Sequence, residues 1–119
     1  MWTVQFEQPF EDWFLSLTRE EKIDILTSIK VLEQYGPRLS RPHVDTLKGS
    51  KLSNLKELRV QHAGDPYRIL FVFDPLRQAV LLCGGNKTGN KRFYEHMIPI
   101  AEESYKQYLE ELDHGKTNQ

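Results

Sequence analysis

LKELRVQHAGDPYRILFVFDPLRQAVLLC, from Leu55 to Cys83, decides the fold of this chain of 119 residues. Three runs rich in branched and aromatic residues, at 55–61, 67–73 and 79–83, predict β-strands. The segments between them, HAGDP and DPLRQ, contain the glycine, proline and aspartate that are typical of tight turns. Strands joined by tight turns pair antiparallel, so this stretch predicts a three-stranded antiparallel meander.

Helical patterns precede the meander. Thr3–Phe6 can form a short first strand, and Pro9 stands where the first turn of a helix tolerates proline. Thr18 and Glu21 have the spacing of a capping box, which predicts a second helix that ends at Gly36. Almost no linker separates these helices, so we expect an antiparallel helical hairpin whose aromatic residues pack in the core.

The remaining segments complete the predicted domain. Residues 38–54 have no periodic pattern and predict a loop. Apolar residues from Phe93 onward keep helical spacing and predict a final helix, with a kink or a restart at Pro99. The expected architecture is one α+β domain over residues 1–112, followed by a flexible tail at 113–119.

Charge is distributed unevenly along the sequence, although the formal net charge is only -1. Residues 38–94 carry eleven basic and four acidic side chains, whereas residues 1–37 carry three and seven, and residues 95–119 carry two and six. A cationic centre attracts polyanions such as nucleic acid, and an ordinary solvated surface is the alternative. No segment is long and apolar enough for a membrane span, and the sequence predicts a cytoplasmic protein.

GGNKTGNKRFYEHM, from Gly84 to Met97, could at first be taken for a nucleotide-binding loop. In the P-loop pattern its lysine position holds Asn90, and no hydroxyl follows to bind magnesium. The four histidines are scattered and no metal-binding motif is present, so no metal or cofactor is predicted. Cys83 lies in an apolar run, which indicates a buried small hydrophobe and not a catalytic thiol.

The same stretch has the composition of a cationic turn that faces RNA. Lys87, Lys91 and Arg92 lie within six residues, and the glycines are expected to give the lysines room near a phosphate. Cleavage of RNA without a metal needs an acceptor for the 2′-hydroxyl proton, cations at the phosphate and a donor for the leaving 5′ oxygen. Tyr94 and, less favourably placed on the helix, His96 can take part in such proton transfers.

Arg68 stands beside a strand that is too apolar to favour a charge. It is either paired with a carboxylate such as Glu57 or lines a cleft. In the strand before it, Leu58 and Val60 alternate with Glu57 and Arg59, which places Arg59 on the more polar face.

These residues resemble a known family. LKELRV, YRILFVFDP and AVLLCGGNKTGNKRFYEHMIPIAEESYKQYL are similar to the RelE/ParE superfamily of bacterial toxins, and within it to the HigB-like branch. The resemblance implies a RelE-like fold and ribosome-dependent mRNA cleavage in the A site, which leaves a 2′,3′-cyclic phosphate. It also implies a cognate helix-turn-helix antitoxin and binding of operator DNA through the complex with that antitoxin.

The resemblance also implies roles for individual residues. Arg68 and Lys87 match basic residues that would stabilise the phosphorane, and Tyr94 matches an aromatic that stacks on a base or shares in proton transfer. Four further side chains are expected to hold RNA: Lys56, Arg59, Lys91 and Arg92. Two other functions on the same fold stay open, namely a ParE-like inhibitor of gyrase and a noncatalytic RNA-binding regulator.

Overall fold

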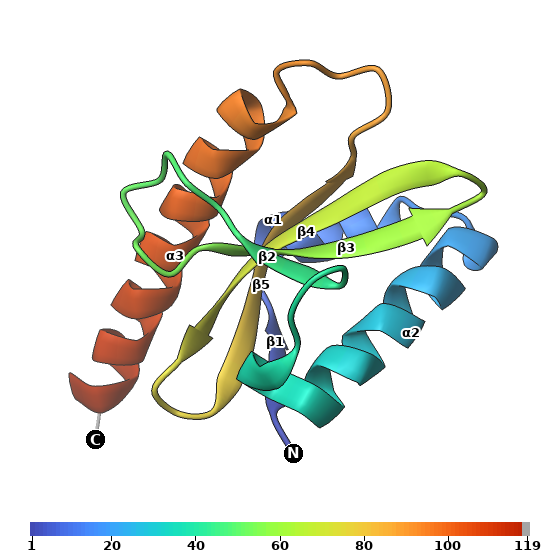
Figure 1. Cartoon of the computed structure of the whole chain (residues 1–119). Helices are drawn as coiled ribbons and strands as arrows, with labels where there is room; N and C mark the ends of the chain where they lie inside the picture. The colour runs from blue at the N-terminus through green and yellow to red at the C-terminus, as the bar shows by residue number, and fades with distance from the viewer. Residues whose placement is uncertain (118–119) are drawn as a thin grey trace.

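The structure is a computed structural model that describes residues 1–117. A five-stranded sheet with strand order β1-β5-β4-β3-β2 lies between helices on its two faces (Figure 1). In chain order the elements are β1 (Thr3–Phe6), α1 (Gln8–Leu15), α2 (Arg19–Tyr35), the 3-10 helix η1 (Gly36–Arg38), β2 (Val44–Thr46), β3 (Lys56–His62), β4 (Asp65–Asp74), β5 (Gln78–Asn86) and α3 (Phe93–Thr117).

The predicted meander of β3, β4 and β5 is confirmed, and one strand is added at each side of it. β1 pairs parallel with β5, which encloses β5 between two neighbours. β2 pairs antiparallel with Lys56–Leu58. The prediction of a loop over residues 38–54 is therefore wrong at Val44–Thr46, because a strand of three residues is too short to show a period of two.

Both turns of the meander lie where the sequence predicts them. Ala63 and Gly64 join β3 to β4 with φ of 50° and 83°, and positive φ at both central residues fits the twist of a two-residue hairpin. In the second turn, the Asp74 carboxylate accepts hydrogen bonds from the backbone N–H groups of Leu76 and Gln78 at 2.8 and 3.2 Å. This carboxylate closes the connection from β4 to β5.

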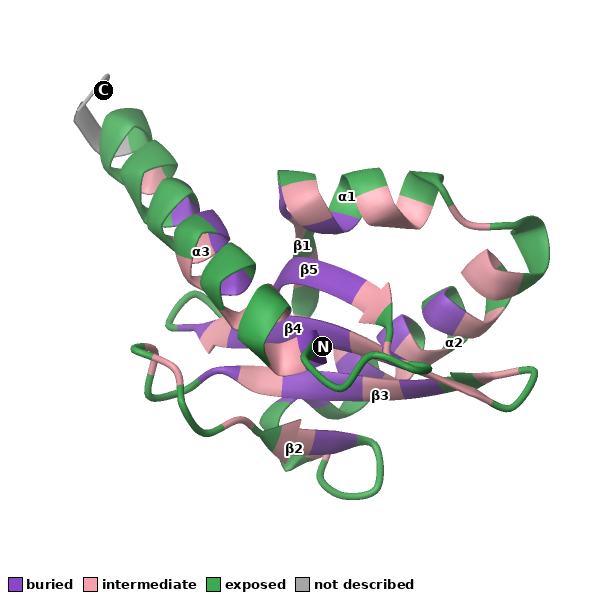
Figure 2. Ribbon diagram, turned by 90° about the horizontal axis from the view of Figure 1, so that it is seen from above, coloured by how far each residue is buried: buried purple, intermediate pink, exposed green. Residues whose placement is uncertain are grey.

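Both faces of the sheet are buried, so the domain has two apolar clusters (Figure 2). Ile69 and Phe71 face α1 and α2, whereas Leu70 and Val72 face α3. Alternate residues of β4 thus enter different clusters, and this explains why β4 is a continuous apolar run in the sequence. The expected α+β arrangement of sheet and helices is confirmed.

The capping box at the start of α2 is also confirmed. The Thr18 hydroxyl accepts from the Glu21 backbone N–H at 3.2 Å, and the Glu21 carboxylate accepts from the Thr18 N–H at 2.8 Å. The same carboxylate accepts a hydrogen bond from the Tyr67 hydroxyl on β4. Because α1 packs mainly on β5 and α2 on β3, the two helices cover neighbouring parts of one face.

The C-terminal helix α3 runs without interruption through Pro99, so the expected restart there is wrong. The Glu102 carboxylate of α3 accepts hydrogen bonds from the Ser50 hydroxyl at 2.8 Å and from the Lys51 backbone N–H at 2.6 Å. These bonds hold the loop before β3 against the helix. The helix continues to Thr117, beyond the boundary at residue 112, and residues 118–119 lie outside the described part. No helix within residues 1–117 is long and apolar enough to cross a bilayer.

Candidate nucleic-acid interface

A buried carboxylate, Glu57, is the centre of a cluster of charged and polar side chains on the α3 face of the sheet. Its side chain is 3% exposed. The Tyr94 hydroxyl donates to Glu57 Oε1 at 2.6 Å, and Arg59 Nε donates to Glu57 Oε2 at 3.2 Å. A buried carboxylate is costly unless it is paired and hydrogen-bonded, and these contacts meet that need.

Arg59 and Arg68 lie directly opposite each other on β3 and β4. Like charges in this arrangement repel, and Glu57 between them offsets the repulsion. Arg68 Nε lies 3.5 Å from Glu57 Oε1 but makes no hydrogen bond with it, and Arg68 Nη1 donates to the Tyr67 carbonyl at 3.0 Å. The interaction of Arg68 with Glu57 is therefore mainly a charge interaction. Arg68 thus pairs with the Glu57 carboxylate and also lines a cleft next to α2.

The cluster extends to the edge of the sheet through Asp45 on β2. Asp45 Oδ2 accepts from Arg41 Nη2 at 2.9 Å and from Arg59 Nη2 at 3.3 Å. The hydrogen bond from Arg41 is the main cause that holds the pKa of the Asp45 carboxyl below its usual value. The Arg41 side chain is 75% exposed, so it presents positive charge to the solvent beside the buried part of the cluster.

Tyr94 stands in the first turn of α3 and connects the cluster to the loop after β5. Burial and the hydrogen bond to Glu57 raise the pKa of Tyr94 to about 12, while Arg68 acts in the opposite direction. The hydroxyl therefore keeps its proton at neutral pH. Lys87 Nζ lies 5.0 Å from the centroid of the Tyr94 ring, a distance at which a cation and an aromatic face attract.

A β-bulge in β5 decides the side on which Lys87 lies. Pairing with β4 shifts register between Leu70 and Phe71, and Leu82 and Cys83 then both belong to the α3 cluster. From Cys83 onward the odd-numbered residues of β5 face α3, and Lys87, the first residue after β5, continues this alternation and lies near Tyr94. Without this shift Lys87 would fall on the face of α1 and α2.

Gly84 and Gly85 have a different role from the one predicted, because they belong to β5 and not to a flexible turn. A Cβ atom on Gly84 would lie 2.5 Å from the Trp13 ring of α1, and one on Gly85 would lie 3.0 Å from Phe93 of α3. The two glycines therefore allow aromatic side chains to pack closely on both faces of the strand. Cys83 beside them is 2% exposed, as predicted, and burial raises the pKa of its thiol to about 12.

Three predicted site residues are brought together, and Arg59 joins them. Arg68 and Tyr94 contact Glu57, and Lys87 joins the cluster through the ring of Tyr94; Glu57 is the group whose importance the sequence did not reveal. Its signal in the sequence is an acidic residue next to the apolar Leu58 in a strand that is otherwise basic or apolar at 56–60.

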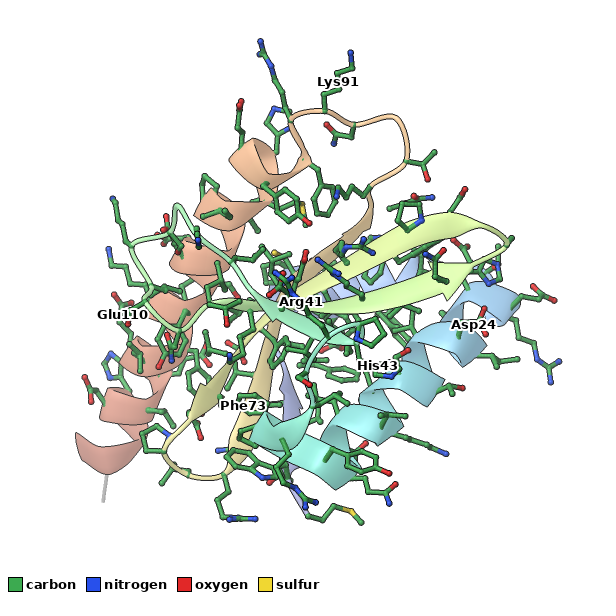
Figure 3. All side chains as sticks on the ribbon, in the orientation of Figure 1. Asp24, Arg41, His43, Phe73, Lys91 and Glu110 are labelled. Carbon is green, nitrogen blue, oxygen red and sulfur yellow. The ribbon has the colours of Figure 1, made fainter. Side chains whose placement is uncertain are left out.

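The other predicted RNA-binding residues lie apart from this cluster. The Lys56 Nζ donates to the Thr46 hydroxyl at 3.0 Å. Because Lys56 and Glu57 are consecutive residues of one strand, the Lys56 side chain leaves the sheet on the face opposite to Glu57. Lys91 and Arg92 are exposed, and Figure 3 shows Lys91 projecting from the loop between β5 and α3. Arg92 lies 4.0 Å from Glu95, and His96 is exposed as well. These side chains could contact a large partner but not the atoms around Glu57.

A cleft of about 530 Å³ opens beside the cluster, between α2 and the outer part of β3. Asp24 on α2 lines it, and its carboxylate lies 2.6 Å from His62 Nδ1. Figure 3 shows Asp24 on α2 and His43 on the segment before β2. The lining residues are Asp24, Thr27, Ser28, Pro42, His43, Arg59, Val60, Gln61 and Arg68.

The sequence matches a known protein family over most of its length. The family described as Phage derived protein Gp49-like matches residues 12–106. The chain belongs to this family. Toxin HigB3 of Mycobacterium tuberculosis is 47% identical over 106 residues, which cover 88% of this chain and 90% of HigB3. Toxin HigB2 of the same organism is 40% identical over 117 residues, which cover 97% of this chain but 58% of HigB2.

Solved structures show the same fold. A free mutant of Escherichia coli toxin RelE has a TM-score of 0.60 and 10% identity, covering 89% of this chain and 96% of RelE. An archaeal RelE–RelB complex from Pyrococcus horikoshii has a TM-score of 0.54 and 20% sequence identity, and the match covers 74% of this chain and 97% of the matched chain. These structures confirm the RelE-like fold, and the relatives HigB3 and HigB2 confirm the resemblance to toxins of the HigB type.

Proposed function

We propose that this protein is the toxin of a toxin–antitoxin pair and that it stops translation by cleaving mRNA on the ribosome. The single observation that carries the proposal is the cluster in which Arg68 and Tyr94 contact Glu57 while Lys87 lies against the ring of Tyr94. Membership of the HigB type supports the toxin assignment. Within residues 1–117 no group of three or more His, Cys, Asp and Glu side chains is placed to hold a metal ion.

In the proposed reaction, the 2′-hydroxyl gives up its proton to water, its oxygen attacks the adjacent phosphorus, and the bond from phosphorus to the 5′ oxygen breaks as that oxygen gains a proton. The products are a 2′,3′-cyclic phosphate and a 5′-hydroxyl. Arg68 and Lys87 stabilise the charge that builds on the phosphorane oxygens. Tyr94, which holds its proton, donates it to the leaving 5′ oxygen or stacks on a neighbouring base.

Glu57 is better suited to position these groups than to accept the 2′-hydroxyl proton. It is 3% exposed, and its two oxygens are already engaged by Tyr94 and Arg59. A base must reach the proton that it removes, and a buried, hydrogen-bonded carboxylate does not reach it in this arrangement.

The partners follow from the same proposal. A cognate helix-turn-helix antitoxin neutralises the protein, and operator DNA is bound only through the complex with that antitoxin. Arg41 is exposed beside the cluster, Lys91 and Arg92 are exposed on the loop before α3, and all three contact mRNA or ribosomal RNA in the A site. Arg59 supports the RNA from the cluster side of β3, and Lys56, on the other face, contacts a more distant part of the RNA or of the ribosome. The protein acts in the cytoplasm, without a cofactor.

Purified protein added to translating ribosomes tests the proposal through the 5′ ends of the mRNA. Lys87→Ala and Arg68→Ala should each abolish codon-phased cuts and relieve growth arrest, since each removes a cation from the phosphate. Lys106→Ala, which removes an exposed lysine of α3, is the matched control and should cut normally. Full toxicity of both site variants would refute the site, and intact mRNA with inhibited supercoiling would indicate a gyrase inhibitor.

A further inference from the structure

The cleft beside the cluster has no role in the reaction described above. β2 pairs with Lys56–Leu58, and the cleft lies alongside the part of β3 that follows. Arg59 and Arg68 line the cleft and also belong to the cluster around Glu57. The two sites are therefore adjacent and share two residues, Arg59 and Arg68.

The two walls of the cleft differ in charge. Arg59 and Arg68 bring two positive charges to the wall next to the cluster, and Glu57 and Asp45 offset part of this charge. The α2 wall carries Asp24 and the hydroxyl residues Thr27 and Ser28. A phosphate is favoured at the arginine wall and repelled by the carboxylate, whereas a base edge can bond to hydroxyls and a carboxylate.

We propose that this cleft is a nucleotide subsite, which holds the base next to the scissile phosphate of the RNA. The inference rests on the proposed endoribonuclease activity and adds to it. The phosphate lies at Arg59 and Arg68, and the base points toward α2. Asp24 accepts a hydrogen bond from an exocyclic amino group, so the subsite prefers adenine, cytosine or guanine over uracil. Uracil has no such amino group.

Asp24 is suited to this role because it is held in place. Its Oδ2 is bound by His62 Nδ1 at 2.6 Å, and its side chain is 44% exposed. A carboxylate oxygen can accept more than one hydrogen bond, so a base can be added to this arrangement. His43 lies on the other side of the cleft and is exposed. Its ring can stack on the base or bond to its edge.

Filling the cleft tests the proposal without changing the cluster. Ser28→Phe and, at the exposed rim, Thr27→Phe place a ring in the cleft, while Leu26→Phe adds the same ring at an exposed position of α2 that does not line it. We would map cuts in mRNAs randomised at one codon. Both cleft variants should lose the base preference at one position next to the cut by roughly tenfold, as expected for about one hydrogen bond. Leu26→Phe should keep it.

Asp24→Asn keeps the shape of the side chain and should reduce discrimination against uracil at that position. Unchanged base preference in Ser28→Phe and Thr27→Phe, with folded proteins by circular dichroism, would overturn the subsite. Preserved preference together with lost binding of the antitoxin would also overturn it, because the cleft would then be a peptide site.

A second arm does not require cleavage. Oligoribonucleotides with a 2′-O-methyl group at the cut site cannot react, and their binding is followed by fluorescence anisotropy. Weaker binding by Ser28→Phe, with normal binding by Leu26→Phe, supports the subsite even when no protein cleaves mRNA. Equal binding by both overturns it. Failure of the wild-type protein to cleave, in contrast, refutes the proposed function and not the subsite.

Discussion

The hydrogen bond between Tyr94 and Glu57 should stabilise the fold measurably, and its magnitude can be worked from the structure. Tyr94→Phe removes a 2.6 Å bond to a carboxylate that is 3% exposed. Hydrogen bonds to charged groups contribute about 1.5–3 kcal/mol. Because Tyr94 is only half-buried, water replaces part of the bond, and we expect a loss of about 1.5 kcal/mol in the free energy of unfolding.

Glu57→Gln should cost more, because the carboxylate also balances Arg59 and Arg68. Removal of one partner from a buried ion pair costs about 3–5 kcal/mol. The Arg59 side chain is 34% exposed and can be hydrated once Glu57 is replaced. We therefore expect a loss of about 3 kcal/mol in the free energy of unfolding, at the lower limit of this range. The double variant should lose less than the sum, since both changes remove the same bond, and the coupling free energy should be about 1 kcal/mol.

Urea denaturation of the wild type, both single variants and the double variant measures this coupling. Tyr35→Phe is the control, because Tyr35 is 45% exposed and should change the free energy of unfolding by less than about 0.5 kcal/mol. Additive losses for Glu57 and Tyr94, within about 0.3 kcal/mol, would refute the reasoning. The contact would then be geometrically close but energetically irrelevant.

The same pair predicts a dependence on pH. The pKa of Tyr94 is raised from the ordinary 10 to about 12 in the folded protein. The folded state holds this proton more tightly than the unfolded state, so the stabilisation is complete below pH 10 and is lost as pH rises toward 12. The difference in phenolate absorbance between wild type and Tyr94→Phe should show this titration. A midpoint near 10 would contradict the buried hydrogen bond.

Two further predictions concern β5. Gly84→Ala should lower the free energy of unfolding by about 1–3 kcal/mol in urea denaturation, because its methyl group meets Trp13 at 2.5 Å. Gly115→Ala is the control, because Gly115 lies in α3 with open space around its Cβ position and the change should not lower the free energy of unfolding. Equal losses of stability in the two variants would disprove the packing role of Gly84. Native Cys83 should resist alkylation by iodoacetamide at pH 8 and react in urea, because burial raises the pKa of its thiol to about 12. Rapid labelling of the folded protein, followed by mass spectrometry, would contradict this.

Much of the fold could be predicted because its signals are local. The capping box at Thr18 and the turn residues at Gly64 and Asp74 act within a few residues, and all three are found as expected. Hydrophobic alternation along β3 and the apolar run of β4 are local as well. Local patterns do not report long-range pairing, and the parallel pairing of β1 and the short strand β2 were therefore missed.

The candidate site was predictable in composition but not in arrangement. The sequence by itself determined the residue types: a cationic centre, an arginine on an apolar strand, and lysines and a tyrosine after the last strand. Only the tertiary structure decided which of them meet. A one-residue bulge turns Lys87 toward Tyr94, and strand pairing places Arg59 opposite Arg68 with Glu57 between them. The physical reason is that a side chain's face depends on the register of hydrogen bonds with strands distant in sequence, and no local pattern encodes that register.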